Sequence, residues 1–354
     1  MESIQLTSKK AMSFRNELYG IAAIWIILFH VAMYTTPLQI SDLSNPNGGG
    51  QLIVNQLFTK IRWLFLRGNL GVDIFLFFSS IGLYQSIHNN NICHFYIRRF
   101  NRVVIPYLLL AVFYFAWHDF IKYNNGIEQF FLNLTTAELW ISGNFPLWYA
   151  SFIVIMYAIY PLLYKWDEKT KHVSTVLIIV VWVAFTAFMW YKQLPLYVNC
   201  ERAVSRFPIF LLGIIAAPHV FKGEGFPIKR WLFILSCIIV LVGFAFVYKY
   251  FSSVPAFIRR YILGAVGIGI IVIWTTLRNK GWLSHIAQPL MFVGAMTFET
   301  YLIHVIIKEI IDIYEWWSFC PTWLWYVIVL ALTIPLAWCL TKLTDIIKNK
   351  FKLV

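Results

Sequence analysis

Long apolar stretches separated by short polar connections repeat along the chain. Each has about 20 residues, the length that a helix needs to cross roughly 30 Å of hydrocarbon. Because lipid offers no partner for backbone polar groups, each stretch is expected to be a helix, whereas barrel strands would alternate in polarity over shorter segments. The pattern predicts ten spans, at residues 18–37, 69–87, 103–121, 146–164, 173–191, 206–221, 231–251, 257–277, 288–311 and 322–343.

The predicted fold is therefore an all-α integral membrane protein, a polytopic bundle of about ten transmembrane helices. The composition agrees, because 60% of the 354 residues are hydrophobic and only 13% are charged, which is too apolar for a soluble chain of this length. No repeat or change of composition marks a boundary, so we expect a single domain over residues 1–354. The first stretch is expected to be a helix and not a removable signal, since it has spanning length and no small-residue cleavage site.

An even number of spans places both termini on one side of the membrane. If that side is the cytoplasm, most of the 29 Lys and Arg residues lie at the inner surface, as the positive-inside rule requires. The formal charge of +13 then serves contacts with lipid headgroups, and there is no basic soluble domain to bind nucleic acid. We expect a multi-pass protein of the cell (cytoplasmic) membrane with both termini cytoplasmic.

Ionisable residues inside spans are costly and mark candidate sites. His30 lies in the outer half of the first span among apolar neighbours, and Asp73 enters the second span at a similar depth. A carboxylate beside a histidine fixes its tautomer and stabilises the imidazolium, as general-base catalysis on a hydroxyl requires. We predict a catalytic His30–Asp73 pair; the alternative is a buried polar pair that only ties two helices together.

A second polar group lies in the outer half of the ninth span and contains Glu299, Tyr301 and His304. Glu299 and His304 are about 140° apart around a helix, so we expect them to meet different partners. These three residues are candidates for binding the substrate.

Three arginines, Arg98, Arg99 and Arg102, follow the second span at the predicted inner boundary and share one helix face. Guanidinium groups on one face form a site for phosphate groups. Anchoring at the inner headgroups is an equally good interpretation.

The five cysteines show no metal-ligand spacing, and we expect no metal. Cys200 and Cys320 fall in predicted outer loops, where a disulfide between them stays open. The longest connection, residues 37–67, ends in an amphipathic segment over 57–66, for which a place along the outer surface and a role as a plain connector are equally good interpretations.

Six short motifs, in this order, resemble those of the acyltransferase 3 family of membrane acyltransferases. They are Gly20–His30, Gly71–Phe75 followed by Ser79–Ser80, Arg98–Arg102 followed by Ile105–Pro106, Trp148–Tyr149, Arg206–Phe207 with Phe210–Gly213, and Tyr301–His304. Each motif is weak alone, and the resemblance comes from their order between about residues 15 and 310.

The resemblance implies a bundle of about ten helices that transfers an acyl group from a cytoplasmic acyl-CoA, usually acetyl-CoA, to sugars, peptidoglycan or other envelope components. It implies an essential role for His30 and donor-side roles for Arg99 and Arg102. We group Arg15 and Arg98 with this donor site. Trp148 and Tyr149 join the predicted substrate-binding residues.

The sequence departs from the family at one position. The family usually has an arginine with ten residues between it and the histidine of the first helix, and Tyr19 stands there in this chain. Arg15 lies one turn earlier and projects within about 60° of the face of His30, so its long side chain is expected to reach the vacated place.

The predicted function is transfer of an acetyl group from acetyl-CoA to a hydroxyl of a cell-envelope glycan or lipid-linked saccharide. His30 would act as the base or as a transient acyl carrier, and Asp73 would orient it. The alternative is a transporter or flippase of an envelope precursor that uses the same buried ions, although the sequence has no interrupted helices in two matching halves.

Overall fold

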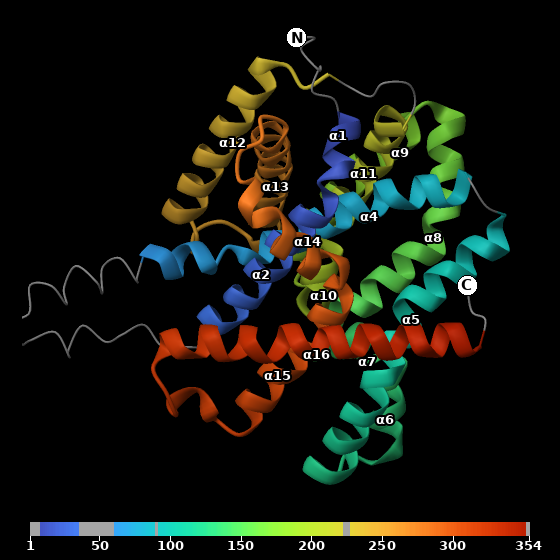
Figure 1. Cartoon of the computed structure of the whole chain (residues 1–354). Helices are drawn as coiled ribbons and strands as arrows, with labels where there is room; N and C mark the ends of the chain where they lie inside the picture. The colour runs from blue at the N-terminus through green and yellow to red at the C-terminus, as the bar shows by residue number, and fades with distance from the viewer. Residues whose placement is uncertain (1–7, 35–59, 89–90, 222–226, 352–354) are drawn as a thin grey trace, which may run out of the picture.

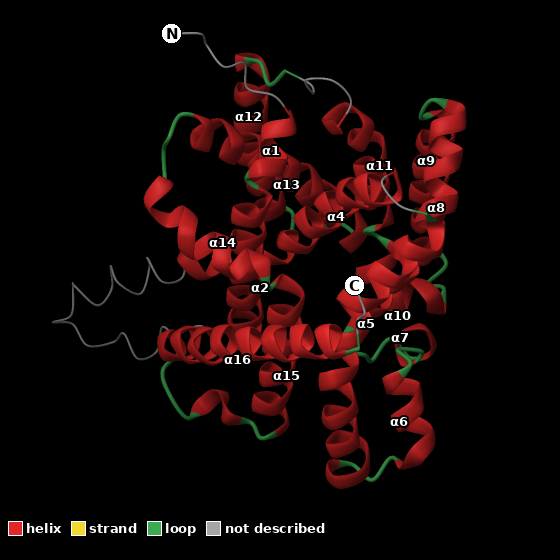
Figure 2. Ribbon diagram, turned by 45° about the vertical axis from the view of Figure 1, so that its right-hand side comes forward, coloured by secondary structure: helices red, strands yellow, loops and turns green. Residues whose placement is uncertain are grey.

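The structure is a computed structural model that describes residues 8–34, 60–88, 91–221 and 227–351. Every regular element in these ranges is a helix (Figures 1 and 2), which confirms the predicted all-α class. Residues 60–65 of the predicted amphipathic segment are helical, and the preceding part of that long connection, from residue 37 to residue 59, lies outside the described residues.

The helices follow one another with short connections. The α-helices are α1 Ser8–Ser13, α2 Arg15–Tyr34, α4 Gly71–His88, α5 Ile92–Ala116, α6 Gly126–Leu134, α7 Glu138–Ile141, α8 Trp148–Thr170, α9 Val173–Tyr191, α10 Pro195–Val204, α11 Phe207–Phe221, α12 Arg230–Lys249, α13 Ala256–Asn279, α14 Ala287–Ala295, α15 Thr297–Ile313 and α16 Thr322–Lys350. Short single turns are η2 Gly68–Leu70, η4 Ser284–Ile286 and η5 Trp316–Ser318, and the π-helical turn η3 Trp117–Lys122 extends α5.

Eight described helical segments are long and apolar enough to cross a membrane, and a ninth results if the bent pair Ser284–Ala295 and Thr297–Ile313 is one span. The predicted polytopic bundle of about ten helices thus compares with eight or nine such segments among the described residues. The predicted span 146–164 is helical as α8, but its Tyr and Trp residues and the charges of its last turns make it less apolar. The predicted span 288–311 is not straight, because the chain bends by 75° between α14 and α15.

Burial divides the helices into a central and a peripheral set. The apolar windows of α2, of residues 60–88 and of residues 195–221 are 56%, 72% and 67% buried, whereas those of α9 and α12 are only 17% buried. The exposed side chains of α9 and α12 are largely Val, Leu, Ile and aromatic residues, as contact with lipid requires. The candidate residues His30 and Asp73 thus lie on central helices.

Two glycines allow α14 to pack directly against α2 (Figure 1). A Cβ on Gly294 would lie 1.8 Å from the carbonyl oxygen of Asn16, and one on Gly20 would lie 2.1 Å from that of Leu290. Small residues permit such close backbone approach between membrane helices. This crossing fixes the position of α14, from which the chain bends into α15 and His304.

The two cysteines considered for a disulfide are both free. Cys200 does not lie in a loop, because residues 195–204 form α10, and its buried thiol donates to the carbonyl oxygen of Leu139 at 3.1 Å. Cys320 is half-buried and lies in the connection between η5 and α16. The structure therefore does not join this pair.

We expect Gly294→Ala to lower the free energy of unfolding by about 1–3 kcal/mol, because the added methyl group forces α2 and α14 apart. Thermal or denaturant unfolding of the purified protein measures the change. Gly264→Ala is the matched control, since the nearest atom to its Cβ, Ile209 Cδ1, is 3.6 Å away. Equal stability of the two variants would show that the close crossing is not required.

Candidate active site

His30 on α2 and His304 on α15 contact each other directly. His30 Nδ1 lies 3.1 Å from His304 Nε2, and the ring centroids are 5.1 Å apart. His304 is only 2% exposed, and its Nδ1 lies 2.8 Å from the carbonyl oxygen of Thr300. The structure thus joins two histidines for which the sequence suggested separate roles.

The contacts of His304 determine where the protons of both neutral rings lie. A carbonyl oxygen only accepts hydrogen bonds, so Nδ1 of His304 donates to Thr300. Nε2 of the neutral His304 ring then has a lone pair and accepts from Nδ1 of His30. His30 consequently has an unprotonated Nε2, which is the nitrogen that can accept a proton or attack an electrophile.

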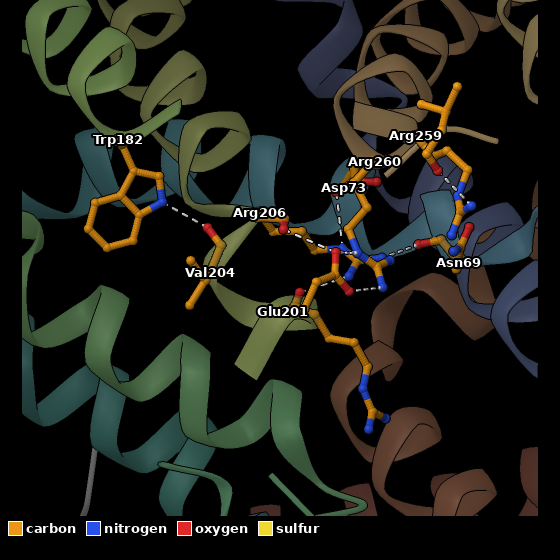
Figure 3. Close-up of polar contacts among 11 residues, drawn as sticks. Asn69, Asp73, Trp182, Glu201, Val204, Arg206, Arg259 and Arg260 are labelled. Carbon is orange, nitrogen blue, oxygen red and sulfur yellow. Dashed lines mark hydrogen bonds and ion pairs between the residues drawn. The ribbon is translucent and has the colours of Figure 1, made fainter. Parts of the chain in front are cut away.

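Asp73 does not form the predicted pair with His30. Its carboxylate accepts from Nε of Arg206 at 3.1 Å, and these side chains are 3% and 2% exposed (Figure 3). Arg206 also donates to the carbonyl oxygens of Arg202 at 2.8 Å and Asn69 at 3.1 Å. The start of α4 lies beside Ala22 and Ile26 of α2, and the buried Arg206 guanidinium there requires the Asp73 carboxylate.

A second buried ion pair lies next to Asp73 and Arg206 (Figure 3). Glu201 on α10 accepts from Nε and Nη2 of Arg260 on α13, both at 2.6 Å, and from the hydroxyl of Ser205 at 3.0 Å. The sequence analysis missed Glu201 because residues 192–205 were taken as a connection outside the membrane. The amphipathic spacing within Pro195–Val204 is the signal that would have placed it on a helix.

The predicted donor-site arginines line one cavity of about 640 Å³. Arg15 comes from α2, and Arg98, Arg99 and Arg102 come from α5. Lys348 of α16, which was not among the predicted site residues, joins them. The described residues that line the cavity include no Asp or Glu, so the cavity is a strongly cationic environment.

Tyr19 and Arg15 share this cavity. The Arg15 guanidinium lies 5.7 Å from the centroid of the Tyr19 ring, a cation–π geometry. Tyr19 also packs edge-on against Phe75 and Phe78, with centroid distances of 5.2 and 6.0 Å. The tyrosine thus fills the wall of the cavity, and Arg15 supplies a positive charge beside it.

Two tyrosines connect the cavity with the histidine pair. Tyr149 and Tyr301 both line the cavity, and the Tyr301 hydroxyl accepts from the backbone N–H of Tyr149 at 3.1 Å. The Tyr301 ring also lies edge-on to His304, with centroids 5.9 Å apart. Tyr301 is therefore the wall between the cavity and the two imidazoles.

The remaining predicted substrate residues have other surroundings. The ring of Trp148 packs against the Arg206 guanidinium at 5.2 Å and supports that ion pair. Glu299 is half-buried and does not line the cavity, in agreement with its expected separation from His304 around the helix. The structure therefore brings Tyr149, Tyr301 and His304 together, with Trp148 edge-on to Tyr149 at a centroid distance of 6.0 Å, and leaves Glu299 outside the cavity.

Comparison with known proteins gives one match. The model of a family described as an acyltransferase domain matches residues 18–342, which include both histidines and the arginines of α5. The comparisons with curated proteins and with solved structures found no match.

We expect Asp73→Asn to lower the free energy of unfolding by about 3–5 kcal/mol, because it leaves the buried charge of Arg206 without a counterion. The double variant Asp73→Leu with Arg206→Met removes both charges and should lose less. Unfolding in detergent compares the variants, with the exposed Glu315→Gln as control. A double variant less stable than Asp73→Asn would contradict this assignment.

Proposed function

The chain belongs to the acyltransferase 3 family, and from this membership we propose that it transfers an acetyl group from acetyl-CoA to a hydroxyl of a cell-envelope glycan or lipid-linked saccharide. The main support is the cationic cavity. It extends along α2 from Arg15 to Ile26, about 16 Å at 1.5 Å per residue, and ends one turn before His30. Family membership favours this acyltransferase over the transporter interpretation.

The donor would bind through its phosphate groups. Coenzyme A carries a 3′-phosphate and a diphosphate, and guanidinium groups bind such oxygens with two parallel hydrogen bonds. Arg15, Arg98, Arg99 and Arg102, with Lys348, supply five positive charges in the cavity. The acyl-bearing arm of the donor would then lie along the cavity toward Tyr301.

His30 would act as the general base. The acceptor hydroxyl gives its proton to Nε2 of His30 while its oxygen bonds to the thioester carbonyl carbon. The carbon–sulfur bond then breaks, and the coenzyme A thiolate takes the proton. His304 holds the His30 ring in the tautomer that leaves Nε2 unprotonated, the task for which the sequence analysis proposed Asp73.

The charge distribution supports a direction for the reaction. The positive-inside rule assigns the α5 arginines to the cytoplasmic side, where acetyl-CoA is available. Tyr34, at the far end of α2 from Arg15, would then lie near the outer surface, and the acceptor would reach His30 from that side. We accordingly propose a location in the cytoplasmic membrane with both termini inside.

His30→Ala should abolish acetyl transfer from labelled acetyl-CoA, and His304→Ala should lower kcat by about 10²- to 10⁴-fold because the His30 tautomer is no longer held. Thermal unfolding should show that both variants remain folded. His285→Ala, at an exposed position, is the control. Full activity of either active-site variant would end this mechanism.

Arg102→Ala should raise the dissociation constant of acetyl-CoA by about tenfold or more, since it removes a charged hydrogen bond to phosphate. Calorimetry of the detergent-purified protein measures binding directly. The exposed Lys229→Ala serves as the control for a general loss of positive charge. Equal affinity for wild type and Arg102→Ala would place the donor site elsewhere.

A further inference from the structure

Arg67, just before η2, is a buried cation without a counterion in the described part of the chain. Its side chain is 6% exposed, and its Nε has no hydrogen-bond partner. The guanidinium lies between two aromatic rings, 5.0 Å from the centroid of Trp63 and 4.6 Å from that of Phe251. Aromatic faces attract a cation but do not neutralise it, and a buried unpaired charge is costly.

A second arginine lies against the same phenyl ring. The Arg259 guanidinium is 4.3 Å from the centroid of Phe251, and it donates to the carbonyl oxygens of Phe251 and, at 2.9 Å, of Val254. No ion pair involves Arg67 or Arg259 within the described residues. Two like charges are therefore held close together on one ring.

The neighbouring carboxylates are already used. Asp73 pairs with Arg206, and Glu201 forms two hydrogen bonds with Arg260, the residue after Arg259. Figure 3 shows Arg259 apart from the Glu201 contact. A counterion for Arg67 and Arg259 must therefore be a group other than the carboxylates of Asp73 and Glu201.

This cluster lies toward the His30 end of the bundle. Arg278, in the last turn of α13, pairs with Glu17 in the first turn of α2. Arg259 is in the first turn of α13, about 28 Å away along the helix. The cluster is thus at the opposite end from Arg15 and the cationic cavity, where the proposed function expects the acceptor.

We propose that Arg67 and Arg259, which both pack against the Phe251 ring, bind a phosphate group of the acceptor or of the lipid beside it. A phosphate has up to two negative charges and several acceptor oxygens, which match two guanidiniums better than a single carboxylate does. Arg67 forms the buried wall of the site, and the half-buried Arg259 opens it to the surface. The assignment of this phosphate to the acceptor rests on the proposed function, whereas the presence of a phosphate site at Arg67 and Arg259 does not.

The test compares wild type with Arg67→Met in a phosphate-free maltoside detergent without acetyl-CoA. Inorganic phosphate should raise the melting temperature of wild type by about 3 °C or more, and this rise should be smaller in Arg67→Met by the part that the Arg67 site contributes. Without phosphate, Arg67→Met should be at least as stable as wild type, because it removes an unpaired buried charge. A purely structural arginine would instead give a variant that is less stable and equally responsive to phosphate.

Two controls separate this site from the cationic cavity. Arg102→Ala, in the cavity, and the exposed Arg230→Gln should keep the phosphate response, and Arg259→Met should lose it even if Arg67→Met fails to fold. A wild-type protein that binds no acetyl-CoA but keeps the phosphate response would remove the proposed function and leave the site standing. A phosphate response that survives Arg259→Met but is lost in Arg102→Ala would overturn the site.

Two further probes identify the source of the phosphate. Calorimetry compares glucose 1-phosphate, a soluble sugar phosphate, with dihexanoylphosphatidylglycerol below its micelle concentration. Tighter binding of the sugar phosphate assigns the site to the acceptor, and tighter binding of the lipid assigns it to a headgroup. Both affinities should fall at least tenfold in Arg259→Met, and unchanged affinities for both probes would refute the site.

Discussion

Every charge inside this bundle has lost its hydration and requires an opposite charge or a hydrogen-bond partner from another helix. In the part of the chain that the structure describes, three buried or half-buried ion pairs between segments meet this requirement: Glu17–Arg278, Asp73–Arg206 and Glu201–Arg260. They join α2 to α13, α4 to the turn between α10 and α11, and α10 to α13. Because α13 takes part in two of them, it is held at both ends, and the central helices that carry the candidate site are held with it.

The sequence predicted those features that depend on one segment at a time. The apolar run before His30 predicts α2, and the spacing of Arg98, Arg99 and Arg102 places three cations on one face, which the cavity then contains. Motif order also predicted the family that the chain matches. These features follow from local hydropathy and helical period, which need no knowledge of neighbouring helices.

Features that depend on which sides of two helices face each other were not predictable in this way. The sequence paired Asp73 with His30 by their predicted depth, but Arg206 takes the carboxylate, and His304 becomes the partner of His30. The bend of 75° before α15 contributes to this difference in pairing, because the prediction took residues 288–311 as one straight helix. Glu201 was missed because helix α10 is short and polar, and its hydropathy resembles that of a loop.

The hydrogen bond from His304 to Thr300 also limits where a proton can go. A proton taken up at Nε2 of His30 can shift the Nδ1 proton to His304, but the carbonyl oxygen of Thr300 has no capacity to pass it further. The two imidazoles can therefore exchange a proton with each other but cannot pass it on across the membrane. In a reaction that begins with His30 as base, the same nitrogen must return the proton to the leaving group, so acyl transfer would require no net proton exchange with either side.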